Sequence, residues 1–257
     1  MNQTSGERLR RIGTAWREVG AGLRRRWRRV VLIGALCGGG LIAGVLAAAL
    51  GTPRWYKPPV IAPEERQKVR NSLVAAEQTF TESLRAGRRR FTYRLMQDDV
   101  NRWITMRREI YPLLDELTPP QWQEPFVTFR RGAITIAGQY RLGPTTVVIS
   151  MDIVPHMEDD ALVLRATAVR CGSVRVPLDV GGIGLGRKIE RRREETWPGS
   201  PRISGDLASG LRLEAQAWWK NGGIEYRVVD VRVEPGVLSI TVEPLGRHRF
   251  EGRSSHD

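Results

Sequence analysis

Residues 174–195, VRVPLDVGGIGLGRKIERRREE, combine a β-like segment, a glycine-rich turn and a basic segment, which are the ingredients of a phosphate-binding loop. A dinucleotide-binding loop needs the spacing G-x-G-x-x-G. If Gly182 is the first glycine, Gly184 fits the second position but Arg187 occupies the last. A Walker loop needs a lysine and a hydroxyl residue directly after its last glycine, whereas Gly186 is followed by an arginine and a lysine. The stretch therefore predicts no nucleotide site, and we expect no cofactor.

A plainer structure fits the same stretch. Pro177 would end an edge strand, and the glycines would then turn the chain into a helix near residues 183–196. The basic side chains of this predicted helix are Arg187, Lys188, Arg191, Arg192 and Arg193. Two interpretations stay open: the helix has a solvated charged face, or it contacts anionic headgroups or an anionic polymer.

The other reactive side chains do not form a catalytic group in the sequence. His156 stands beside three acidic residues in PHMEDD, which fits a solvated hairpin turn better than a cation site. Cys37 and Cys171 lack zinc-ligand spacing, and the sequence contains no G-x-S-x-G elbow. We therefore expect that the protein is not an enzyme and that it binds no metal.

The N-terminal part of the chain has the pattern of a membrane anchor. Residues 1–29 hold nine arginines and two glutamates, and residues 30–50 follow without a charge. At about 1.5 Å per helical residue this uncharged segment spans about 30 Å, the hydrocarbon thickness of a bilayer. Trp27 at one end and Trp55 with Tyr56 at the other suit the membrane interface. The arginines predict a cytoplasmic N-terminus, so the protein would sit in the cell membrane with its bulk outside the cytoplasm.

Three further features of this segment bear on its role. Cleavage after Ala49 is an alternative, but the apolar stretch is longer than a signal-peptide core and favours a retained anchor. Small residues four apart let membrane helices approach closely and predict a homodimer through Gly34, Gly38, Gly40 and Gly44. The apolar residues of the tail recur every three or four positions among arginines, as in a helix lying on an anionic inner leaflet.

The charge of the remaining chain argues against nucleic acid as a partner. The formal charge of the protein is +13, and removing the +7 of residues 1–29 leaves only +6 for the rest. The high isoelectric point thus reflects membrane topology, and we expect no nucleic-acid binding.

The chain divides into a tail, a span, a proline-rich linker at residues 51–63, an outer domain at residues 64–245 and a polar tail at residues 246–257. Helical periodicity predicts helices over residues 63–86 and 97–114, the latter with Asp98 or Asp99 as its N-cap.

Later segments of the outer domain read mostly as strands. Alternating and β-branched runs predict strands within residues 89–95, 134–142, 145–154 and 161–171, and a closing hairpin over residues 224–245. Between them we expect a helix with Leu207, Leu211, Ala215 and Trp218 on one side. The fold class is therefore α+β, with an N-terminal transmembrane helix and one extracytoplasmic domain in which helices flank a curved antiparallel sheet.

Three local motifs resemble a family of small bacterial extracytoplasmic proteins with one N-terminal anchor, typified by the YpmS-like and YceB-like proteins. They are FTYRLMQDDVNRWI (91–104), with Asn101 near the start of its helix, AVRCGSVRVPLDV (168–180) and VVDVRVEPGVLSITVEP (228–244). The resemblance implies an elongated α+β domain, similar to the tubular lipid-binding fold, whose curved sheet can hold a lipid or another amphiphile. The basic cytoplasmic tail is not part of the family pattern.

Taken together, the sequence predicts a single-pass, membrane-anchored extracytoplasmic binding protein that holds a lipid or other amphiphile in envelope maintenance. The alternative is a non-catalytic scaffold that recruits protein partners or an anionic envelope polymer through its basic helix. An apolar ligand that copurifies with the protein would distinguish the first function from the second.

Overall fold

The computed structural model describes residues 36–87, 89–110, 121–177, 203–219, 221 and 223–247. The chain divides into two units, Met1–Ala48 and Ala49–Asp257. Residues 36–50 are helical. Within the described ranges, no helix combines the length and the apolar character needed to cross a membrane. The span expected over residues 30–50 begins outside the described residues and stays a prediction.

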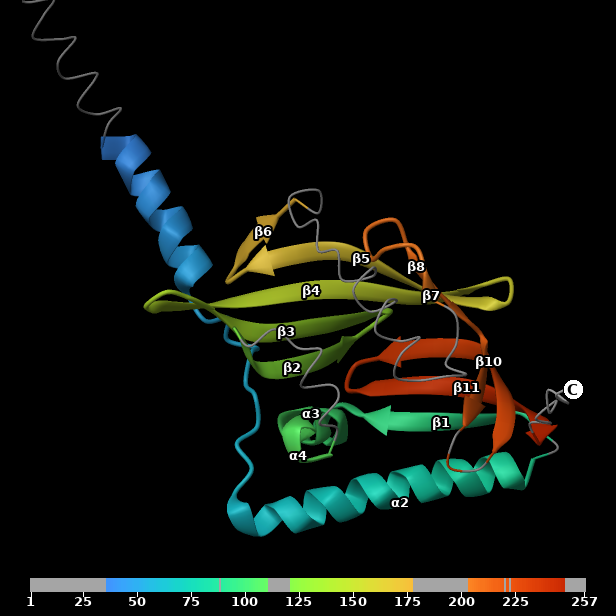
Figure 1. The fold of residues 1–257 in the computed structure, drawn as a ribbon. Coiled ribbons are helices and arrows are strands. Elements are labelled where there is room, and N and C mark those ends of the chain that lie inside the picture. The colour runs from blue at the N-terminus through green and yellow to red at the C-terminus, as the bar shows by residue number, and fades with distance from the viewer. Residues whose placement is uncertain are drawn as a thin grey trace, which may run out of the picture. The chain divides into compact units, whose positions relative to one another are not determined.

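The second unit has two antiparallel sheets and a small number of helices (Figure 1). Its helical elements are η1 (Pro63–Glu65), α2 (Arg66–Arg85), α3 (Gln97–Thr105) and α4 (Arg107–Ile110). Its longer strands are β1 (Phe91–Met96), β2 (Trp122–Arg130), β3 (Ala133–Leu142), β4 (Thr145–Glu158), β5 (Ala161–Cys171), β10 (Ile224–Glu234) and β11 (Val237–Arg247). Its short strands are β6 (Val174–Val176), β7 (Ile203–Ser204), β8 (Leu211–Glu214) and β9 (Gln216–Trp219).

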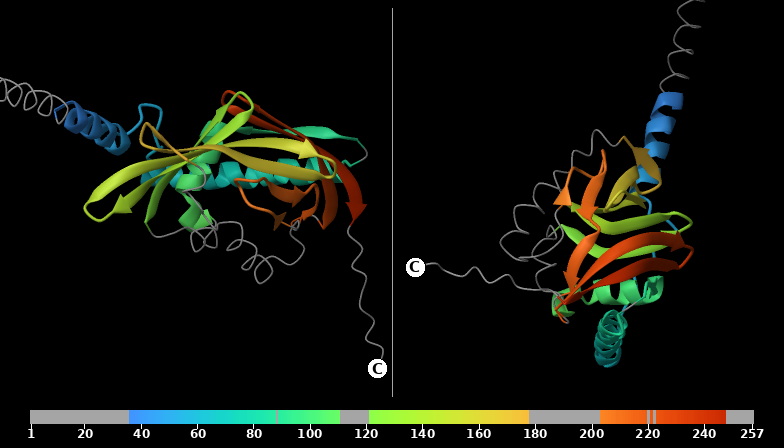
Figure 2. Two further views of the ribbon diagram at one scale, coloured as in Figure 1. Left: turned by 90° about the horizontal axis from the view of Figure 1, so that it is seen from above. Right: turned by 90° about the vertical axis from the view of Figure 1, so that its right-hand side faces the viewer.

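One sheet has four strands in the order β1-β11-β10-β9, and the other has seven, with the path β2-β3-β4-β5-β8-β7 and β6 beside β5. Every strand pair is antiparallel. This confirms the expected α+β class with antiparallel pairing, but the strands form two sheets where a single curved sheet was expected. Figures 1 and 2 show α2 on the side of the domain opposite the seven-stranded sheet.

Helix α2 confirms the periodicity of its sequence. Pro63 opens the preceding 3-10 turn, and Val69, Leu73 and Leu84 lie on the buried side of the helix. The helix stops before Gly87, where an added Cβ would lie 2.4 Å from the carbonyl oxygen of Leu84. That carbonyl needs the free space which only glycine leaves.

The next helical segment differs from the expectation in two ways. Helix α3 has Met96 as its N-cap, without a side-chain cap, so the predicted cap at Asp98 or Asp99 is wrong. Both carboxylates lie instead in the first turn of α3, where they favour the helix dipole. The segment also bends at Met106, after which α4 begins, and residues 111–114 lie outside the described residues.

The prediction of a helix with Leu207, Leu211, Ala215 and Trp218 on one side is wrong. The chain forms β8 and β9 there, and Leu211 and Leu213 pair with β5. The spacing of the apolar residues fits both periods, but pairing with two sheets satisfies the backbone and buries Leu211 at 7% exposure. The helix expected near residues 183–196 lies outside the described residues.

The edge of β2 is closed by side chains instead of by another strand. Asn101 of α3 donates from Nδ2 to the carbonyl of Val127 at 2.8 Å and accepts from its N–H at 2.7 Å. Gln97 accepts from the N–H of Phe129 at 2.7 Å, and Tyr56 donates to the carbonyl of Glu124. These contacts satisfy the backbone groups that an open edge would offer to another chain.

The two sheets meet where the turn of the β10–β11 hairpin reaches the turn between β2 and β3. The N–H of Gly132 donates to the carbonyl of Val233 at 2.8 Å, and that of Gly236 donates to the carbonyl of Phe129 at 3.2 Å. A buried cluster of Val127, Phe129 and Val233 lies beneath this junction. The junction fixes the position of one sheet against the other.

Candidate functional site

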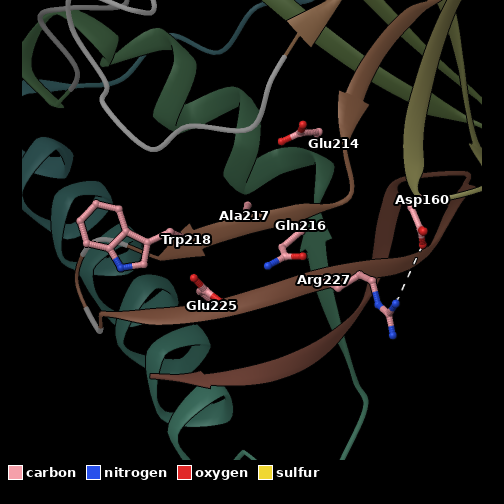
Figure 3. A pocket seen from close by; sticks show the side chains of 7 residues that line it. All are labelled: Asp160, Glu214, Gln216, Ala217, Trp218, Glu225 and Arg227. Atoms are coloured by element: carbon pink, nitrogen blue, oxygen red, sulfur yellow. Dashed lines mark ion pairs between the residues drawn. The ribbon is translucent and has the colours of Figure 1, made fainter. Parts of the chain in front are cut away.

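A pocket of about 470 Å³ lies where the four-stranded sheet meets the turn between β4 and β5 (Figure 3). Its lining residues come from the β4–β5 turn, the end of β8, β9 and the start of β10, and they are Asp160, Glu214, Gln216, Ala217, Trp218, Glu225 and Arg227. Three carboxylates and one tryptophan therefore surround a single cavity.

Strand pairing places four of these side chains on one face of the sheet. Glu225 lies opposite Trp218, and Arg227 lies opposite Gln216. Facing residues of an antiparallel pair point to the same side, so both pairs project toward the pocket. Figure 3 shows these side chains spread along the two strands, with Glu225 between Trp218 at one end and Arg227, beside Asp160, at the other.

The other face of the same two strands belongs to the core. Trp219 and Tyr226 pack against Phe80 of α2, with ring centroids 4.9 Å and 5.8 Å apart. The indole N–H of Trp219 donates to the hydroxyl of Thr81 at 2.8 Å. This anchored layer holds the pocket face of β9 and β10 in position.

Ala215 carries the chain from one sheet to the other at the pocket. Its N–H donates to the carbonyl of Asp160 at 2.9 Å, and its own carbonyl accepts from the N–H of Val228 at 2.8 Å. Ala215 is only 1% exposed, so a larger side chain would not fit this crossing. The crossing brings Asp160 and Glu214 over the strands that carry Trp218.

The electrostatics of the pocket are acidic in a chain that is otherwise basic. Arg227 is the lining cation, and its guanidinium lies 2.7 Å from Glu243 and 3.9 Å from Asp160. The hydrogen bond to Glu243 raises the pKa of Arg227, and the same bond lowers the pKa of Glu243. Glu214, Trp218 and Glu225 make further interactions of their own. Among the described residues that line the pocket, three are acidic and one is basic.

The described lining offers groups that can bind a cation. Carboxylates pair with ammonium or guanidinium groups, and the face of an indole ring attracts a cation or an apolar group. His156 lies 4.0 Å from Glu158, and Arg212 also binds that carboxylate at 3.0 Å. Among the described residues, no group of three or more histidine, cysteine or acidic side chains is placed to hold a metal. The turn expected at PHMEDD is confirmed only for Asp159 and Asp160, because Pro155 to Glu158 belong to β4 and pair with β5.

Two residues expected at the membrane interface pack against the seven-stranded sheet. Tyr56 is 5% exposed, in a cluster with Phe126, Ala137 and Val148, and burial, followed by the nearby charge of Glu124, raises the pKa of its phenol. Trp55 stacks on Phe126 at 6.5 Å between centroids. The ring of Tyr56 thus lies in a buried cluster, and a membrane-interface role for Trp55 and Tyr56 stays a prediction.

The remaining predicted contacts are not brought into the pocket. The residues Trp27, Gly34, Arg187, Lys188, Arg191, Arg192 and Arg193 lie outside the described residues. Gly38, Gly40 and Gly44 are helical, and an added Cβ at any of them would meet nothing within 4 Å. The homodimer through these glycines stays a prediction.

The sequence does not indicate that the residues lining the pocket lie close together in the fold. Trp218 and Trp219 are neighbours on β9 and therefore point to opposite faces of the sheet. The alternation of Gln216 and Trp218 is the signal that could have placed both on one face. The approach of Asp160 depends on the crossing at Ala215, which has no sequence signature. Comparisons with protein-family models, with curated proteins and with solved structures find no match to this chain.

Proposed function

We propose that this chain is a single-pass, membrane-anchored binding protein without catalytic activity, and that its outward domain holds a small cationic amphiphile in the acidic pocket. The observation that carries the proposal is that Asp160, Glu214, Glu225 and Trp218 all line one pocket. These residues come from three parts of the chain and from both sheets.

The anchor in this proposal comes from the sequence. Residues 30–50 are uncharged, and residues 1–29 carry nine arginines on one side of them. This asymmetry favours a retained anchor with its N-terminus in the cytoplasm. Residues 51–257 would then work outside the cytoplasm.

The pocket chemistry supports a ligand with a cationic head and a short apolar part. Its volume of about 470 Å³ falls in the range of about 300–1,000 Å³ that is usual for small-molecule sites. The carboxylates would pair with the head of the ligand, and the indole of Trp218 would cover its apolar part. A ligand with an anionic head would face net repulsion from the same lining.

The family resemblance implies a lipid or another amphiphile, and the acidic pocket favours an amphiphile with a cationic head group. Apolar residues of the four-stranded sheet pack against α2 in the cluster of Leu84, Ile224 and Val242, and against the other sheet in the cluster of Val127, Phe129 and Val233. A long acyl chain would need apolar surface of its own, whereas the acidic pocket suits a head group. Lipid extraction from the purified full chain, followed by mass spectrometry, separates an acyl-chain ligand from a small cation.

The charge preference of the pocket gives a direct test with three probes of the same chain length. Hexyltrimethylammonium, hexanoate and hexanol would each be titrated by calorimetry into the full chain in lipid nanodiscs, with empty nanodiscs as the control. We expect saturable binding of the ammonium probe and none of the other two. Equal heats from all three probes, or no heat beyond the empty nanodiscs, would overturn the proposal.

A further inference from the structure

We infer that the tip of the β3–β4 hairpin contacts the membrane in which the chain is anchored, and that it binds anionic lipid headgroups there. The tip is defined as residues 141–145. The inference rests on the membrane anchor of the proposed function. It places the acidic pocket at the end of the domain away from the lipid.

A short tether joins the predicted span to the outer domain. Tyr56 is 5% exposed and lies against Phe126, Ala137 and Val148, so the chain is fixed to the seven-stranded sheet at this residue. The N–H of Tyr56 also donates to the carbonyl of Pro53 at 3.0 Å, which tightens the chain into a turn. Six residues separate Tyr56 from the end of the span at residue 50, and a chain of that length reaches at most about 20 Å.

The point where Tyr56 is fixed lies nearer to one end of the seven-stranded sheet than to the other. Leu142 is five residues from Ala137 along β3, or about 17 Å at about 3.3 Å per residue. The other end of β4, at Glu158, is ten residues from Val148, or about 33 Å. The hairpin tip therefore lies nearer to the fixed point of the tether than the β4–β5 turn does. Figure 1 shows the β3–β4 hairpin and the β4–β5 turn at opposite ends of the domain.

The β3–β4 tip and the β4–β5 turn, at the two ends of the sheet, differ in the side chains that they expose. The tip exposes Leu142 at 54% beside the exposed Arg141, a pair that suits insertion at a headgroup layer with an anionic lipid. Exposed Arg54 and Lys57 flank the fixed point of the tether. The opposite turn exposes the acidic side chains of Glu158, Asp159 and Asp160, the first paired with Arg212 and the last with Arg227. An anionic surface would attract the first end and repel the second.

The backbone of the tip forms a tight turn that is held to the rest of the domain. Gly143 has a φ of +60°, a backbone conformation that L side chains rarely adopt, and it allows β3 to turn tightly into β4. Arg141 is tied to the rest of the domain by its N–H, which donates to the carbonyl of Gln121 at 3.2 Å. The tip is thus a fixed part of the sheet.

The inference can be tested by fluorescence quenching with the full chain. Leu142→Cys would be introduced in a background that carries Cys37→Ser and Cys171→Ser, labelled with an environment-sensitive dye and reconstituted into vesicles of equal parts phosphatidylcholine and phosphatidylglycerol. Leu245→Cys is the matched control, because it is also an exposed leucine, at 43%, and it adjoins Gly246, which pairs with Glu225 of the pocket.

Lipids with a nitroxide in the headgroup should quench the label at residue 142 at least about fivefold more than the label at residue 245, because quenching by such lipids falls steeply with distance from the surface. Equal quenching at the two positions, or stronger quenching at residue 245, would overturn the inference. Flotation of the same vesicles separates the two claims. Protein that fails to float contradicts the anchor, whereas protein that floats without quenching at residue 142 contradicts only the contact of the tip.

Discussion

Substitution of Asn101 by alanine tests how the edge of β2 is closed. The Asn101 side chain is 2% exposed and makes two hydrogen bonds to the backbone of Val127, at 2.8 Å and 2.7 Å. Alanine would leave the N–H and the carbonyl of Val127 without these partners in a site that is 6% exposed. Each unpaired buried group costs about 1–3 kcal/mol, so the upper bound is about 6 kcal/mol.

A smaller value is expected because the substitution leaves room for water, which can pair with part of the exposed backbone. We therefore predict that Asn101→Ala lowers the free energy of unfolding by about 2–4 kcal/mol. Urea unfolding of the full chain in detergent, followed by circular dichroism, measures this change. Asn71→Ala is the matched control, because Asn71 is an exposed asparagine that accepts a hydrogen bond from Gln67. It should change the stability by less than about 0.5 kcal/mol.

The result that refutes this reasoning is a loss for Asn101→Ala no larger than that of Asn71→Ala. Gln97→Ala provides a graded comparison, because Gln97 makes a single hydrogen bond to the N–H of Phe129, at 2.7 Å. Its expected loss is about 1 kcal/mol. If both edge substitutions cost the same, the two bonds of Asn101 do not contribute as the structure indicates.

Two further substitutions follow from the seven-stranded sheet. A Cβ at Gly138 would lie 2.4 Å from the ring of Trp122, so Gly138→Ala should cost about 1–3 kcal/mol in urea unfolding. Adding Trp122→Ala should remove most of that penalty, and an additive double variant would contradict the contact. Burial acts to raise the pKa of Asp152, but hydrogen bonds from Arg170 and Thr135 outweigh it and hold the pKa below its usual value of 3.8. Because the folded pKa is lowered, the stabilisation is present above about pH 4 and is lost as the pH falls through the folded value. Asp152→Asn should therefore cost about 1–2 kcal/mol at neutral pH and progressively less below about pH 4, and a pH-independent difference would contradict the assignment.

Local periodicity predicted the elements that are formed by residues close together in the chain. The spacing of Val69, Leu73 and Leu84 predicted α2, and the hairpin of β10 and β11 followed from alternation around Gly236. In both cases one face is apolar and the turn chemistry agrees with it. Such elements follow from sequence because the local pattern and the tertiary packing require the same conformation.

The sequence did not predict the features that depend on distant contacts. Leu211 and Ala215 satisfy a helical period as well as a strand period, and pairing with β5 and β10 decides between them. The ring of Tyr56 suits either a headgroup layer or a buried cluster, and the contact with Phe126 decides that case. The pocket combines both problems, because Asp160 and Trp218 meet only through the crossing at Ala215.

The most direct test of a cation-binding pocket compares two glutamates on one strand. Hexyltrimethylammonium would be titrated into the full chain carrying Glu225→Gln, which alters the pocket, or Glu234→Gln, which removes an exposed carboxylate at the far end of β10. A charged hydrogen-bonding contact contributes about 1.5–3 kcal/mol, so Glu225→Gln should raise the Kd about 10- to 100-fold. Glu234→Gln should leave the Kd unchanged. An equal effect of the two substitutions, with both variants folded by circular dichroism, would contradict the assignment of the pocket as the binding site.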